Sequence, residues 1–177
     1  KQIRQAAIKV FLDKGFRNTV MNDIMEATGL SRGGLYHHYG STYEILYDIM
    51  VEGNLNRKDI IQKSINDEGL ILSPHLFSRM IIDKILADND YAKLYIMFLC
   101  ELKENDDLKE LYVKIKKESI QVFKELFYSL FKELPSDETF EFMINIMNSG
   151  LMACEILNAR ENFTKNKIYL TEMIETY

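Results

Sequence analysis

The chain contains no apolar run that approaches the ~20 residues of a membrane-spanning helix, although 47% of its 177 residues are hydrophobic. Its first residues, KQIRQAAIKVF, form an amphipathic pattern rather than a secretion signal, and because they include no initiator Met we expect a short segment to precede them. The composition is otherwise ordinary for a globular protein, with 28% charged residues. We therefore expect a cytoplasmic protein of one or two domains that does not enter a membrane.

The sequence motifs of catalysis and metal binding are also missing. Cys100 and Cys154 form no C-x-x-C pair, and none of the three histidines follows a Glu by three positions, the spacing that di-iron bundles use. There is no H-E-x-x-H, no G-x-S-x-G and no glycine-rich phosphate loop. We therefore expect no catalytic residue, no metal, no cofactor and no enzymatic activity, and we expect both cysteines to be buried free thiols.

Strand signals, internal repeats and low-complexity segments are absent as well, and apolar residues recur at helical spacing instead. The sequence therefore predicts an all-α protein. Two short helices are expected within residues 19–39. The other expected helices cover about 2–14, 42–65, 74–87, 91–103, 107–133, 137–160 and 165–177.

Residues 19–44 carry the signals of two helices joined by a tight turn, with a third helix starting after them. Thr19 is a good N-cap residue, and the apolar positions after it have helical spacing. Gly29 can adopt a positive φ and end the first helix, and Ser31 can cap the second. The sequence S-T-Y-E at 41–44 is a capping box that predicts the start of the next helix.

The second of these helices has an apolar face with Leu35 and Tyr39, and an opposite face that is polar and partly free of side chains. Such a face suits a helix placed in the DNA major groove, which is about 12 Å wide. Arg32 is the candidate for base readout, with a solvent-facing Arg that only attracts DNA as the alternative. Gly33 and Gly34 each cost up to about 1 kcal/mol in a helix. Close approach of the backbone to DNA explains them, and so does a frayed first turn.

The order G-L-S-x-G-x-L-Y-x-H-Y at residues 29–39, preceded by Thr19, Ile24 and Ala27, resembles the TetR family of transcriptional regulators. The resemblance extends over residues 3–49 and implies a helix-turn-helix that binds an operator in double-stranded DNA. The residues expected to contact DNA are Thr19, Val20, Ser31, Arg32, Gly33, Gly34, Tyr36, His37 and Thr42.

The charge distribution agrees with a DNA-binding N-terminus even though the net charge of the chain is −5. Residues 1–40 hold six basic and three acidic residues, a net charge of +3, so the remainder carries −8. The family usually has Lys at the start of the fourth helix, where this chain has Thr42. Compensation by that helix N-terminus, or by Lys14 and Arg17, is left open.

We expect a helix-turn-helix DNA-binding domain at residues 1–49 and a helical domain for ligand binding and dimerisation at residues 50–177. The second domain is rich in Met and aromatic residues, which pack plain cores but also line adaptable apolar pockets. The family resemblance implies a small-molecule inducer pocket there. The expected lining residues are Phe77, Met80, Tyr95, Phe98, Tyr112, Phe123, Phe127, Met143 and Met147.

The segment 137–160 offers the best candidate for a homodimer interface, because it combines an apolar stripe with small residues that let a partner helix approach closely. The family resemblance implies that the last helices pair around a twofold axis. The expected interface residues are Phe140, Ile144, Met147, Gly150, Leu151 and Cys154.

Together these patterns predict a repressor that leaves a palindromic operator when an apolar or amphipathic inducer binds. Two alternatives stay open. One is a helix-turn-helix that binds a protein instead of DNA, and the other is an activator without a small-molecule inducer.

Overall fold

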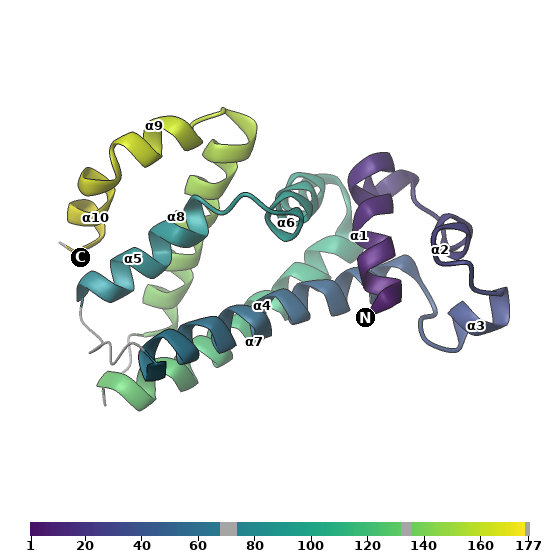
Figure 1. Ribbon diagram of the computed structural model, residues 1–177, viewed down its shortest axis with the longest axis horizontal. Coiled ribbons are helices and arrows are strands. Elements are labelled where there is room, and N and C mark those ends of the chain that lie inside the picture. Colours follow the sequence, from purple (N-terminus) through teal and green to yellow (C-terminus); the bar gives the residue numbers. More distant parts are fainter. Residues whose placement is uncertain (68–73, 132–135, 176–177) are drawn as a thin grey trace. The chain divides into compact units, whose positions relative to one another are not determined.

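The structure of the protein is a computed structural model that describes residues 1–67, 74–131 and 136–175. Within these ranges it does not describe the side chains of residues 60, 61, 64–67, 74, 76, 77, 122, 126, 127 and 129–131. All the regular elements in the described part are helices, as the sequence predicts (Figure 1). They are α1 (Gln2–Lys14), η1 (Phe16–Asn18), α2 (Met21–Thr28), α3 (Arg32–Tyr36), α4 (Thr42–Asp67), α5 (Pro74–Ile85), α6 (Asp90–Glu101), η2 (Leu102–Glu104), α7 (Asp106–Phe131), α8 (Asp137–Ile156), α9 (Arg160–Lys165) and α10 (Lys167–Glu175).

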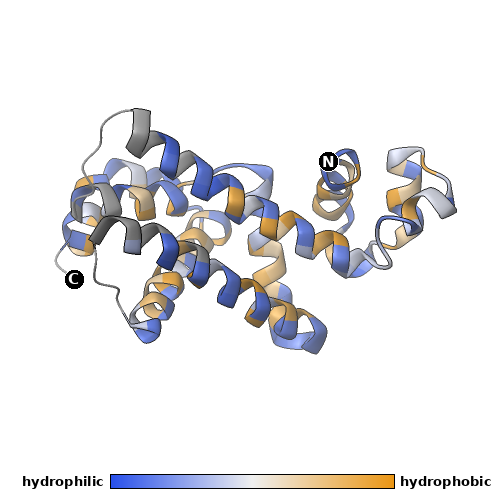
Figure 2. Ribbon diagram, turned by 90° about the horizontal axis from the view of Figure 1, so that it is seen from below, coloured by the Kyte–Doolittle hydropathy of each residue, from blue (hydrophilic) through white to orange (hydrophobic). Residues whose placement is uncertain are grey.

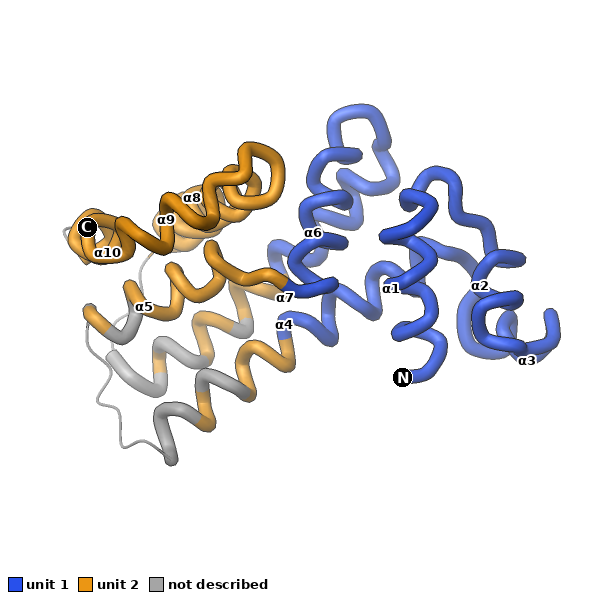
Figure 3. The backbone as a smooth tube through the Cα atoms, turned by 45° about the horizontal axis from the view of Figure 1, so that its top comes forward, with its two compact units in different colours: residues 1–54, 89–117 blue, residues 55–88, 118–177 orange. Residues whose placement is uncertain are grey.

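The chain forms two compact units (Figure 3). Unit 1 consists of Lys1–Asn54 and Asn89–Lys117, and unit 2 consists of Leu55–Asp88 and Glu118–Tyr177. Unit 1 therefore includes α6 and the start of α7 besides the N-terminal helices. The functional boundary between residues 49 and 50 stays a prediction.

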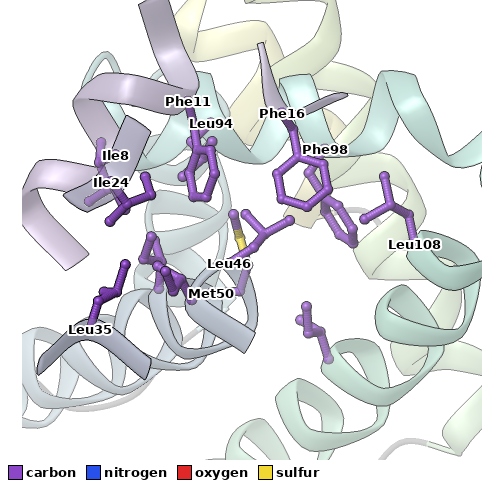
Figure 4. Close-up of a cluster of buried hydrophobic side chains, with 14 residues drawn as sticks. Ile8, Phe11, Phe16, Ile24, Leu35, Leu46, Met50, Leu94, Phe98 and Leu108 are labelled. Atoms are coloured by element: carbon purple, nitrogen blue, oxygen red, sulfur yellow. The ribbon is translucent and has the colours of Figure 1, made fainter. Parts of the chain in front are cut away.

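The core of unit 1 joins the N-terminal helices to α4, α6 and the start of α7. Figure 4 shows side chains from all of these elements pointing into one cluster. Phe16 lies at its centre, with its ring centroid 5.3 Å from that of Phe11 and 5.1 Å from that of Tyr43. A three-helix unit alone would have a marginal core, and the added helices supply the missing apolar surface. The fully buried side chains of this cluster include Phe11, Ile24, Leu35, Ile45, Leu46, Ile49, Leu94, Phe98 and Leu108.

The core of unit 2 lies chiefly between α5 and α8. Ile81 and Ile85 of α5 pack against Ile144 and Met147 of α8. Gly150 of α8 is needed at this crossing, because a Cβ atom built there would lie 2.9 Å from Ile85 Cγ1. The small residue thus permits a close approach within one molecule.

The structure confirms several of the expected helix ends. Gly15 ends α1 with φ 80°, and Gly29 ends α2 in the left-handed conformation with φ 69°. Ser31 caps α3, accepting from Gly34 N, and Ser136 caps α8, accepting from Thr139 N. Local capping and glycine conformations therefore fix these four boundaries.

Other helix ends differ from the expectation. The N-cap of α2 is Val20 rather than Thr19, because the Asp23 carboxylate accepts the Val20 N–H at 2.8 Å. α7 begins at Asp106, one residue before the expected 107, and Asn105 caps it by accepting from Leu108 N at 3.1 Å. The helix expected at 165–177 is replaced by two short helices, α9 (Arg160–Lys165) and α10 (Lys167–Glu175).

Apolar and polar residues occupy opposite sides of the helices (Figure 2), the pattern that directs one face of each into a core. None of the helices in the described ranges has the length and hydropathy that crossing a membrane requires. Cys154 is buried as expected, whereas Cys100 is exposed because it lies on the solvent side of α6.

Candidate nucleic-acid interface

The helix-turn-helix consists of α2, the turn around Gly29, and α3. Leu35 is the only fully buried residue of the short helix α3, and it anchors the helix to the core of unit 1. The helix ends at Tyr36, earlier than its apolar pattern suggests, and Tyr39 follows after a turn. One anchor on a five-residue helix leaves its other sides facing solvent.

The exposed side of α3 presents Arg32 and Tyr36. The Arg32 guanidinium carbon lies 5.5 Å from the centre of the Tyr36 ring, and the Tyr36 residue is 44% exposed. A cation over an aromatic face is weakly attracted to it, so the two side chains orient one another without being buried. Both therefore point away from the core and are accessible to a ligand as large as DNA.

The two glycines of α3 have different surroundings. A Cβ atom built on Gly33 would meet no atom within 4 Å, so the backbone there is open to solvent. A Cβ atom on Gly34 would lie 3.4 Å from Ser31 Oγ, which is already used as the cap. Of the two, Gly33 is the position where an approaching partner could contact the main chain.

Two exposed imidazoles extend this surface. His37 follows α3 directly, and its ring centroid lies 5.2 Å from that of His38. Both side chains are exposed, so both can donate or accept hydrogen bonds at the surface. Their positions agree with the expected polar face.

The residues expected to contact DNA from the starts of α2 and α4 differ in accessibility. Thr19 is buried at 5% exposure, and its hydroxyl donates to Gly15 O at 2.8 Å. Val20 is 57% exposed instead, which places it on the surface rather than in the core. Thr42 is half-buried at the first turn of α4. A contact from the Thr19 side chain would require its internal hydrogen bond to break.

Three of the six basic residues in the first 40 are engaged in ion pairs. Arg4 pairs with Asp48 and Glu52, Lys14 pairs with Asp23, and Arg17 pairs with Glu101 and Glu104. These contacts are at 2.5–3.6 Å. In the part of the chain that the structure describes, Lys1, Lys9 and Arg32 form no ion pair. Lys14 and Arg17, considered above as replacements for a lysine at position 42, are therefore already neutralised. Arg32 is thus the cation of α3, and it forms no ion pair with the described residues.

The pKa values of two of these carboxylic acids are shifted by their surroundings. The Lys14 ammonium, together with the Val20 N–H, holds the pKa of Asp23 below its usual value. Burial raises the pKa of Glu101, against the effect of Arg17, and Glu101 Oε2 has no hydrogen-bond partner. Arg17 thus serves the folding of unit 1.

A polar network holds the helix-turn-helix against α4. The Arg4 guanidinium donates to Glu52 at 2.7 Å and lies 3.3 Å from both the Tyr39 hydroxyl and Asp48. The Tyr39 hydroxyl donates to Asp48 at 2.8 Å. No sequence spacing signals this network, because its members lie up to 48 positions apart.

Comparison with known proteins identifies the architecture. Residues 3–49, which contain nearly all of α1, then α2, α3 and the start of α4, match the profile described as bacterial regulatory proteins, tetR family. The N-terminal part of the chain is therefore similar to the TetR family. YfiR of Bacillus subtilis (strain 168), an uncharacterized HTH-type transcriptional regulator, is 44% identical to it over 52 residues. That match covers 29% of this chain and spans only a quarter (25%) of the length of YfiR.

Solved structures share the fold of nearly the whole chain. Salmonella enterica GusR has a TM-score of 0.70 at 18% identity, covering 99% of this chain and 90% of GusR. The fatty acid degradation regulator FadR from Bacillus halodurans has a TM-score of 0.69 at 17% identity, covering 98% and 93%. At these identities the likeness shows the fold alone.

The residues expected to line an inducer pocket divide between the two units. Tyr95, Phe98 and Tyr112 belong to unit 1, where the Phe98 ring lies 6.2 Å from each of the other two rings. Met147 is buried in unit 2 and Met143 packs beside it. Met80 and Phe123 are half-buried in unit 2, and the side chains of Phe77 and Phe127 lie outside the described residues. The pocket stays a prediction.

The residues expected to form the dimer interface face the interior of unit 2. Gly150 contacts Ile85, and the large side chains of the stripe are at most 7% exposed. A partner helix cannot reach this stripe in the folded unit, so it is a core face of α8. Its large side chains are Phe140, Ile144, Met147, Leu151 and Cys154.

Within the described residues, no three His, Cys, Asp or Glu side chains gather into a metal-binding group. The surface with the clearest functional character is therefore the exposed side of α3 with the residues that follow it.

Proposed function

We propose that the protein is a homodimeric DNA-binding transcriptional regulator that reads its operator with α3. The observation that supports this most strongly is the combination of a free Arg32 with an open backbone at Gly33 on one exposed face. An Arg side chain can donate two parallel hydrogen bonds to guanine O6 and N7. Because Gly33 has no side chain, the backbone of α3 beside Arg32 can come close to the bases of the major groove.

Contacts around Arg32 would position α3 without reading sequence. Tyr36 and His37 are exposed hydrogen-bonding groups of the kind that bind phosphate oxygens. Val20, at the start of α2, adds an exposed apolar side chain. Such phosphate contacts set the register of the protein on the duplex.

Dimerisation is proposed on the exposed side of α8 and on α10, not on the stripe first expected. Phe142, Ile146 and Ile156 of α8 are 57%, 46% and 50% exposed, and their spacing places them on one face. Tyr169 and Met173 of α10 are 62% and 65% exposed. Large apolar side chains gathered on a surface favour association with a second copy.

The regulatory part of the proposal is that unit 2 binds a small apolar or amphipathic inducer, which releases the operator. The inducer must bind the free conformation more tightly than the DNA-bound one, since only differential binding can shift the population. Repression by steric exclusion of polymerase is the simplest outcome for such a protein.

Selection of binding sites from a random duplex pool tests the proposal. We expect an enriched sequence made of two inverted half-sites whose centres are one or more helical turns apart, about 34 Å per turn. If the protein retained DNA but enriched no particular sequence, the result would contradict operator recognition. Enrichment of a single half-site would contradict the homodimer but would agree with recognition of DNA by α3.

A further inference from the structure

Two neighbouring histidines lie at the end of the exposed surface of the helix-turn-helix. His37 follows α3 directly and His38 comes next, with both side chains exposed and their ring centroids 5.2 Å apart. In the described part of the chain, the histidine that pairs with a carboxylate is His75, 2.8 Å from Glu175, and not His37 or His38. Histidine changes its charge between about pH 5 and 8, so this surface gains positive charge under mildly acidic conditions.

Permanent positive charge is scarce on the same surface. Lys14 and Arg17 are held by carboxylates, and the first residue of α4 is the uncharged Thr42. Residues 31–40 contain one permanent cation, Arg32, and no acidic residue. Protonation of both histidines therefore raises the net charge of this segment from +1 to +3.

The acidic side chains of α2 and of the first two turns of α4 are engaged by other groups. They are Asp23 with Lys14, Glu26 with the Asn22 amide, Glu44 with Gly40 N, and Asp48 with Arg4 and the Tyr39 hydroxyl. Two positively charged imidazoles whose rings are 5.2 Å apart also repel one another. A protonated pair at this place therefore takes its counter-charge from a binding partner.

We propose that His37 and His38 bind backbone phosphates of the operator in their protonated form, so that DNA binding takes up protons. The inference rests on the proposed function, in which α3 enters the major groove. A phosphate beside the pair offers two oxygens to the ring N–H groups, and its charge offsets the repulsion between the rings. Bound DNA thus favours the protonated state, and by linkage a lower pH strengthens binding.

This proton linkage differs from sequence recognition in its signature. Affinity rises as the pH falls from 8 to 6, by at most about tenfold per pH unit for each proton taken up. The dependence on salt also steepens, by about 0.9 in log–log slope for each imidazole that neutralises a phosphate. Phosphates carry no sequence information, so an operator and a scrambled duplex gain affinity alike while Arg32 keeps its preference for the operator.

The test uses the full chain with a labelled operator and a scrambled duplex, and measures fluorescence anisotropy at pH 8, 7 and 6 over a series of salt concentrations. His37→Gln, His38→Gln and the double Gln variant keep a hydrogen-bonding side chain that cannot become charged. The double variant His37→Lys with His38→Lys is charged at every pH used. His75→Gln is the matched control, because it removes the third histidine of the chain, which belongs to unit 2 and pairs with Glu175.

We expect the wild type and His75→Gln to bind both duplexes on the order of tenfold or more tightly at pH 6 than at pH 8. The double Gln variant should lose that gain, and the double Lys variant should bind tightly at both pH values. Both imidazoles are exposed, so the variants should fold, which circular dichroism at each pH checks. Absence of the gain in the wild type, or a gain that survives in the double Gln variant, would overturn the proposal. A full gain in one of the single variants would overturn the role of that histidine.

Failure of this inference is distinguishable from failure of the proposed function. A protein that selects an operator but binds it equally well at pH 6 and pH 8 remains a DNA-binding regulator without proton linkage. A protein that selects no operator, but binds every duplex more tightly at pH 6 through the two histidines, keeps the phosphate contacts and loses the regulatory role.

Discussion

The Arg4 guanidinium of α1 donates from Nε to the Glu52 carboxylate of α4 across 2.7 Å. The same guanidinium lies beside the Tyr39 hydroxyl and Asp48, so it joins α1, the segment after α3, and α4. Arg4 and Glu52 are only 23% and 21% exposed in their side chains, which protects the contact from water. This pair fixes α1 and the segment after α3 on α4.

Arg4→Met should therefore loosen the N-terminal helices. We expect the free energy of unfolding to fall by about 1–3 kcal/mol, because two carboxylates and a hydroxyl lose a charged donor. Urea denaturation of the purified protein measures the change. Lys9→Met is the matched control, since Lys9 is exposed and forms no ion pair with the described residues; an equal loss in both variants would show that the network contributes nothing.

Gly33→Ala should separate folding from DNA binding. The added Cβ atom would meet no atom within 4 Å. Alanine stabilises a helix by up to about 1 kcal/mol relative to glycine, so the melting temperature should not fall. Operator affinity should drop if the backbone approaches DNA there. Fluorescence anisotropy with labelled operator measures it.

The control for Gly33 is Gly53→Ala on α4, where a Cβ atom would make an ordinary contact 3.5 Å from Tyr91. Operator binding should be unchanged in that variant. Unchanged binding in Gly33→Ala as well would mean that the glycine serves only the first turn of α3.

Gly150→Ala should destabilise unit 2. Its new Cβ atom would lie 2.9 Å from Ile85, closer than real contacts allow, and overpacking of a core typically costs about 1–3 kcal/mol. Chemical denaturation reports the loss, with Ser149→Ala on the exposed neighbouring position as the control. Normal stability combined with a weakened dimer would instead restore Gly150 to a subunit interface.

Lys84→Met should stabilise the protein more at pH 6 than at pH 9.5. The pKa of Lys84 is lowered to about 7 in the folded state, so above that pH the unfolded chain binds more protons and stability rises toward the ordinary lysine pKa. At pH 6 the folded protein must keep the desolvated charge, which methionine removes.

We expect the stabilisation by Lys84→Met to be larger at pH 6 by roughly 1–2 kcal/mol, because one unit of pKa corresponds to about 1.4 kcal/mol and partial exposure screens the effect. Urea unfolding of wild type and variant at both pH values measures the difference. Lys58→Met is the control, because it removes a lysine that pairs with Glu125 at 3.0 Å. A pH-independent difference would show that the ammonium is solvated.

The sequence was sufficient for the elements whose signals are local. Gly15, Gly29 and Ser31 sit where their backbone or capping chemistry is needed, and the apolar spacing of α1 predicts its full extent. The exposure of Arg32 and Gly33 was also predictable, because they belong to one short helix with a single buried anchor, and their contact with DNA stays a prediction.

The orientation of α8 could not be predicted from its spacing, because it has apolar residues on two faces. Ile144 and Leu151 mark one stripe, and Phe142 and Ile146 mark another, so periodicity alone does not decide which stripe is buried. The close crossing with α5 at Gly150 decides it. The same limit applies to Arg57, whose contact with Met80 connects segments 23 positions apart.

The most direct test of the central claim is the affinity of wild type and Arg32→Ala for the selected operator and for a scrambled duplex, measured over a series of salt concentrations. Wild-type binding should weaken with a log–log slope of about −0.9 per neutralised phosphate. Arg32→Ala should lose about 1–3 kcal/mol of preference for the operator while still binding DNA through its phosphates. Operator binding that is indifferent to salt and unchanged in Arg32→Ala would contradict a DNA-reading role for α3.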